Sequence, residues 1–108
     1  MSLRDKAIAL SQTLNAVVAA LERYQESDYI RELAAYLTPV VARYDEAVYV
    51  TRSREHAAAA IDALSECMDS VNAAATRGEM DIFGEPVLER YWDLRTVFRE
   101  SRYREQSL

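Results

Sequence analysis

Apolar side chains recur along this chain at alternating intervals of four and three residues, which is the period of one face of an α-helix. The first such stripe comprises Leu3, Ala7, Leu10, Leu14, Val17, Leu21 and Tyr24. The second comprises Ala57, Ile61, Leu64, Met68, Val71 and Ala75. Because a helix with an apolar stripe must bury that stripe, each pattern predicts a helix that packs against another helix.

The composition excludes most alternatives to an all-helical domain. A length of 108 residues suits one domain with a single modest core, so we expect residues 1–108 to form one unit. Two glycines and two prolines supply too few turn residues for a set of β-hairpins. Cys67 is the single cysteine and lies beside an apolar stripe, so we expect a buried thiol and a cytoplasmic protein.

Cap and turn residues divide the chain into four predicted helical segments. The first runs from the N-cap Ser2 to about Gln25, and the second begins after a polar interruption at residues 27–28. The third follows the N-cap Ser53 and ends before Gly78, which suits the left-handed residue that closes a helix. The fourth begins with Pro86, and its apolar stripe comprises Val87, Tyr91, Leu94 and Phe98.

The second segment contains Pro39 in its middle. Its apolar stripe keeps one phase on both sides of this proline, which favours one helix kinked at Pro39. The alternative is that Thr38 caps a new helix in which Pro39 takes the first position. The stripe comprises Ile30, Leu33, Leu37, Val40, Tyr44 and Ala47. The predicted fold is therefore all-α, an antiparallel up-down-up-down four-helix bundle whose second helix is kinked at Pro39.

A second apolar stripe follows the same segment on a rotated face. It comprises Tyr29, Tyr36, Val40, Ala47 and Val50. A helix that is apolar on two faces needs either a central place in the bundle or an external partner. Tyrosine is enriched at protein interfaces because its ring is apolar and its hydroxyl tolerates water. We therefore predict a homodimer interface here, and the alternative is a broad core whose tyrosines reach the solvent.

Carboxylates gather on one face of the third segment, namely Glu55, Asp62, Glu66 and Asp69. Such a face is most often simply solvated. As an alternative metal site, Asp62, Glu66 and Asp69 resemble the carboxylates with which helical nucleotide pyrophosphohydrolases bind Mg²⁺. That resemblance implies a magnesium-dependent enzyme acting on a nucleotide. A matching pair on another helix is not evident, so our prediction includes no metal and no other cofactor.

Arg52 and His56 offer a second resemblance. They are similar to the Arg-then-His motif of HEPN-type helical ribonucleases, in which both residues act on RNA at a dimer cleft. The spacing here is shorter than the usual one by at least one residue. The formal charge of −5 also disfavours nucleic acid as a partner.

The function that these observations favour is a protein–protein interaction module that associates with itself. No segment is apolar enough to span a bilayer, so we expect no membrane partner. Three alternatives remain open: the magnesium-dependent nucleotide enzyme, a small helical chaperone for a secreted or flagellar subunit, and the HEPN-like ribonuclease. Whether the protein is an enzyme therefore stays undecided by the sequence.

Overall fold

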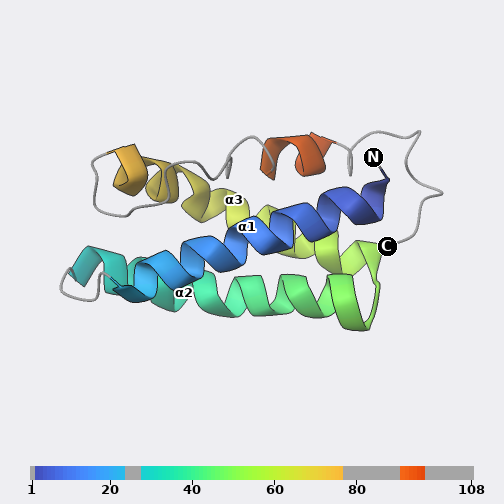
Figure 1. The fold of residues 1–108 in the computed structure, drawn as a ribbon, viewed down its shortest axis with the longest axis horizontal. Coiled ribbons are helices and arrows are strands. Elements are labelled where there is room, and N and C mark those ends of the chain that lie inside the picture. The colour runs from blue at the N-terminus through green and yellow to red at the C-terminus, as the bar shows by residue number, and fades with distance from the viewer. Residues whose placement is uncertain (1, 24–27, 77–90, 97–108) are drawn as a thin grey trace.

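The computed structural model describes residues 2–23, 28–76 and 91–96, and these residues form helices and short turns without any strand. The elements in chain order are α1 (Leu3–Arg23), α2 (Asp28–Asp45), the π-helix η1 (Glu46–Val50) and α3 (Arg54–Thr76). Residues 91–96 are also helical. The helices α1, α2 and α3 lie side by side, and each runs in the direction opposite to the one before it (Figure 1).

Both predicted N-caps are confirmed. The hydroxyl of Ser2 accepts a hydrogen bond from the backbone N–H of Asp5 at 3.1 Å, and the carboxylate of Asp5 accepts one from the N–H of Ser2 at 3.4 Å. This reciprocal capping box fixes the start of α1. At the start of α3, the Ser53 hydroxyl accepts the N–H of His56 at 3.1 Å. Each cap supplies an acceptor to an N–H that has no partner inside its helix.

The core is built from the stripes that the sequence predicts. Apart from the rotated stripe of the second segment, every described member of the predicted stripes is buried: Leu3, Ala7, Leu10, Leu14, Val17, Leu21, Ile30, Leu33, Leu37, Val40, Tyr44, Ala47, Ala57, Ile61, Leu64, Met68, Tyr91 and Leu94. The thiol of Cys67 is buried as well. Tyr24, Val87 and Phe98, together with the side chains of Val71 and Ala75, lie outside the described part of the chain.

Helix α2 packs against both α1 and α3. It runs without interruption through Pro39, so no new helix begins at Thr38. At Glu46 the α-helix changes to the wider π-helix. The sequence did not predict this change, because the apolar stripe of the second segment keeps one phase. In η1 the N–H of Thr51 donates to the carbonyl of Glu46 at 3.0 Å, five residues back. This extra residue per turn rotates the side chains that follow Asp45 relative to those of α2.

Residues 91–96 attach to the rest of the bundle through buried side chains and one ion pair. Tyr91 and Leu94 are fully buried, and the Tyr91 hydroxyl donates a hydrogen bond to the carbonyl of Ile61 at 3.2 Å. The ammonium of Lys6 lies 2.6 Å from the carboxylate of Asp93. These contacts join residues 91–96 to both α1 and α3.

Within the described residues, no helix combines the length and the apolar character that crossing a membrane requires.

Candidate functional site

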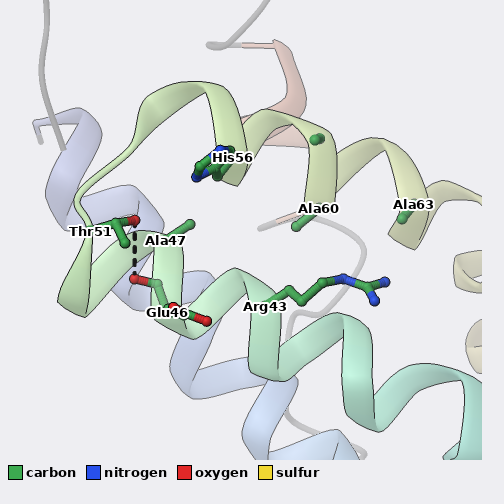
Figure 2. A pocket seen from close by; sticks show the side chains of 8 residues that line it. Arg43, Glu46, Ala47, Thr51, His56, Ala60 and Ala63 are labelled. Carbon is green, nitrogen blue, oxygen red and sulfur yellow. Dashed lines mark hydrogen bonds between the residues drawn. The ribbon is translucent and has the colours of Figure 1, made fainter.

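A pocket of about 390 Å³ lies between the C-terminal part of α2, η1 and the first turns of α3 (Figure 2). Its lining consists of Arg43, Glu46, Ala47, Thr51, His56, Ala59, Ala60 and Ala63. The pocket therefore combines four alanines with four side chains that carry polar groups.

The alanines make the apolar part of this pocket. Ala47 and Ala60 are buried, whereas Ala59 and Ala63 keep part of their surface in solvent. Because each side chain is a single methyl group, the backbones of η1 and α3 are covered by little more than Cβ atoms here. A run of small residues on facing helices thus leaves a hollow that larger side chains would fill.

The polar side chains stand around the alanines, and all four are exposed. Arg43 lies along the groove between the helices, and His56 lies on the α3 side (Figure 2). Thr51 hydrogen-bonds through its hydroxyl to the carbonyl of Glu46 at 3.5 Å. Among the described residues no carboxylate lies within ion-pair distance of Arg43. The rim therefore presents a cation to whatever occupies the pocket.

A hydrogen-bond network on the α1 side holds η1 in place. The Ser11 hydroxyl donates to one carboxylate oxygen of Asp45 at 2.6 Å, and the Asn15 amide donates to the other at 2.9 Å. One turn further on, the guanidinium of Arg4 donates to the carbonyl of Val48 at 3.0 Å. Because Asp45 directly precedes η1, these bonds fix the position of Glu46 at the pocket rim. The sequence signal for this network was the polar pair Ser11 and Asn15 four residues apart on α1.

Tyr36 links α2 to α3 beside the pocket residue Ala63. Its hydroxyl donates a hydrogen bond to the carbonyl of Ala63 at 3.1 Å, so its ring spans the groove from α2 to α3. Tyr36 and Tyr29 are each 39% exposed. Tyr29, Tyr36 and Arg43 follow one another at seven-residue intervals, which places them on one side of α2. We call these three residues the α2 face.

The structure divides the predicted interface residues into two groups. Val40 on α2 and Ala47 on η1 are each only 2% exposed, so they belong to the core of the single chain. Tyr29 and Tyr36 are accessible, and Val50 on η1 is 74% exposed. Binding of a partner to this surface stays a prediction. Arg43 was not among the predicted residues, although the seven-residue spacing from Tyr29 and Tyr36 pointed to it.

The carboxylates of α3 that the sequence offered as an alternative metal site do not form a cluster among the described side chains. Asp62 and Asp69 lie on the exposed side of α3, and the side chain of Glu66 is outside the described part of the structure. Among the described side chains, no group of three or more His, Cys, Asp or Glu residues is arranged to hold a metal ion.

The Arg-then-His pair is also separated by the turn between η1 and α3. Arg52 has a positive φ of 51°, in the left-handed region that favours glycine, and it does not line the pocket. His56 does line it, together with Arg43. The arginine that shares a pocket with His56 is therefore Arg43 from α2.

No protein family model, no curated protein and no solved structure matches this chain.

Proposed function

We propose that this protein is an interaction module that associates with itself through the α2 face. The observation that carries the proposal is the exposure of Tyr29 and Tyr36, 39% each, on one side of a helix beside an alanine pocket. Val50, at 74% exposure on η1, adds apolar surface at the same end of α2 as the pocket. Large tyrosine rings next to a hollow are the features expected of a protein interface.

A second copy of the chain is the partner that this face suits best. A two-fold contact uses the same patch on both subunits, so the patch must complement itself. The α2 face contains both aromatic rings and a cation, Arg43, and these attract one another. It also combines the exposed ring of Tyr29 with the hollow beside Arg43. One surface thus carries both halves of a complementary contact.

Sedimentation equilibrium tests this proposal. The unmodified protein should be dimeric at tens of micromolar, since an interface with a dissociation constant of about 1 μM would be largely occupied there. The substitution Tyr36→Glu brings two carboxylates together at the centre of the interface and should yield a monomer with unchanged circular dichroism. Tyr49→Glu is the matched control, because Tyr49 is 44% exposed but does not belong to the α2 face. An unmodified protein that sediments as a monomer contradicts the proposal.

We further propose that the complete chain forms an up-down-up-down four-helix bundle in which α2 is kinked at Pro39. The alternating directions of α1, α2 and α3 support this topology (Figure 1). The buried Tyr91 and Leu94 in the helical residues 91–96 support a fourth helix packed on the same core. The buried free thiol of Cys67 supports a reducing compartment, the cytoplasm, as the location.

A further inference from the structure

We infer that the alanine pocket binds a short zwitterion, an unbranched amino acid whose ammonium and carboxylate stand at opposite ends of a methylene chain. The inference goes beyond self-association and does not depend on it. It assigns the carboxylate of the ligand to Arg43 and the methylene chain to the alanines. The ammonium is assigned to Glu46, Thr51 and His56 at the other end of the pocket.

The pocket contains one cation and one anion that do not neutralise each other. Arg43 and Glu46 are three residues apart, a spacing at which opposite charges on a helix can reach one another. Figure 2 shows instead that the Arg43 guanidinium points along the groove, away from Glu46 and toward the end at which Ala63 is drawn. In the described part of the chain neither Arg43 nor Glu46 forms an ion pair. Only a ligand that carries both signs of charge complements both side chains.

The end of the pocket at Glu46 matches a primary ammonium group. The Glu46 carboxylate supplies the opposite charge. The Thr51 hydroxyl donates its proton to the Glu46 carbonyl at 3.5 Å, which leaves the lone pairs of the hydroxyl oxygen as acceptors. In its neutral form the imidazole of His56 adds an acceptor nitrogen. An ammonium has three N–H donors, one for each of these three side chains.

The end of the pocket at Arg43 matches a carboxylate. A guanidinium presents its N–H donors in a planar fork, and a carboxylate accepts two of them side by side. Because Arg43 is exposed, this ion pair adds only modestly to affinity, and binding depends on all three parts of the ligand together.

The alanines determine the middle of the ligand. The α3 side of the pocket runs from His56 to Ala63, seven residues or about 10 Å along the helix axis. The methyl groups of Ala59, Ala60 and Ala63 offer apolar contact and no hydrogen bond, so they favour methylene groups over polar ones. In extended 6-aminohexanoate about 7 Å separates the nitrogen from the carboxyl carbon, which leaves room for a hydrogen bond at each end. The volume of about 390 Å³ lies in the range of pockets that hold small molecules.

Titration of the ¹⁵N-labelled full chain with 6-aminohexanoate, followed by NMR, tests the inference. We expect saturable shifts of amide signals from η1 and the first turns of α3, with a dissociation constant of about 1 mM or below. Hexanoate lacks the ammonium and hexylamine lacks the carboxylate. Each should bind about fivefold or more weakly than 6-aminohexanoate, because each leaves one charged side chain of the pocket without a partner.

Two variants assign the ends of the ligand. Arg43→Gln should lower the affinity for 6-aminohexanoate to that for hexylamine and leave hexylamine binding unchanged. Glu46→Gln should lower it to that for hexanoate and leave hexanoate binding unchanged. The matched controls are Arg31→Gln and Glu32→Gln, which make the same changes at exposed positions of α2 outside the pocket. Circular dichroism checks that all four variants fold.

The inference is supported if 6-aminohexanoate binds most tightly and each pocket variant loses only the contribution of its own end. It is overturned if hexanoate or hexylamine binds as tightly, if the controls lose as much affinity as the pocket variants, or if no saturable shift occurs at tens of millimolar ligand. Sedimentation of the same samples without ligand reports self-association separately. A monomer that binds the zwitterion therefore contradicts the proposed dimer alone, and a dimer that does not bind it contradicts this inference alone.

Discussion

The hydroxyl of Tyr44 donates a hydrogen bond to the main-chain carbonyl of Ala7 at 2.8 Å, deep between α2 and α1. Tyr44 is 0% exposed, so its phenol stays in a low-dielectric environment. Burial is the largest cause that raises the pKa of this phenol, and the neighbouring Asp45 and Tyr49 raise it further. The folded protein therefore holds Tyr44 in its neutral form, in which it can donate this bond.

This relationship predicts a loss of stability at alkaline pH. In the unfolded chain a tyrosine ionises with a pKa of about 10, whereas the pKa of folded Tyr44 is higher. Above pH about 10 the unfolded state thus holds fewer protons than the folded state, so the free energy of unfolding falls as the pH rises. Urea unfolding at a series of pH values measures this slope.

Tyr44→Phe provides the control for the alkaline loss. It removes the ionising group and should flatten the slope above pH about 10, although it lowers stability near neutrality by about 1 kcal/mol through the lost hydrogen bond. Burial also raises the pKa of Tyr91, so part of the slope should persist in this variant. An unchanged slope in Tyr44→Phe would assign the alkaline sensitivity to other groups.

The carboxylate of Asp45 should stabilise the junction between α1 and η1. Asp45→Ala removes the acceptor of Ser11 and of Asn15, and Ser11 is only 1% exposed. A buried hydroxyl that loses its hydrogen-bond partner lowers the free energy of unfolding by about 1–3 kcal/mol. We expect chemical denaturation to show a loss in this range. Glu32→Ala, which removes an exposed carboxylate from α2, should change stability much less. Equal effects of the two substitutions would contradict the structural role of Asp45.

Leu64 should contribute strongly to the free energy of unfolding. It is 0% exposed on α3, so Leu64→Ala removes buried methyl groups and leaves a cavity. We expect a loss of about 2–5 kcal/mol in chemical denaturation. Val50→Ala is a suitable apolar control because Val50 is 74% exposed. A loss below about 0.5 kcal/mol for Leu64→Ala would place this residue at the surface and disprove the helix phase.

Pro39→Ala should leave the fold intact and raise helicity or stability. Proline has no N–H, so within α2 the carbonyl of Ala35 lacks its usual helical donor, and the proline ring crowds the preceding turn. Alanine restores the donor, and the free energy of unfolding should rise by up to about 3 kcal/mol, the difference in helix propensity between the two residues. Circular dichroism and thermal unfolding measure it, with the exposed neighbour Thr38→Ala as the reference substitution. A marked loss of stability in Pro39→Ala would show that the bundle depends on this proline.

Sequence periodicity was sufficient for the helices and for the residues that each helix buries. Leu10 and Leu64 could be assigned to the core because only one side of α1 and of α3 is apolar throughout. The N-caps Ser2 and Ser53 could also be predicted from the sequence, because a hydroxyl just before a helix accepts a hydrogen bond from a backbone N–H three residues later. These properties depend on local geometry, which the order of residues fixes.

Only the tertiary structure decided which side of α2 reaches the solvent and which residues share the pocket. The sequence could not assign Val40 to the core or to an interface, because that depends on how the neighbouring helices pack against α2. Likewise, Arg43 and His56 line the same pocket because the π-helix and the turn at Arg52 fold α3 back beside α2. Helix packing and the extra residue in the π-helical turn decide which residues of different helices lie near one another. Neither feature leaves a periodic signal in the sequence.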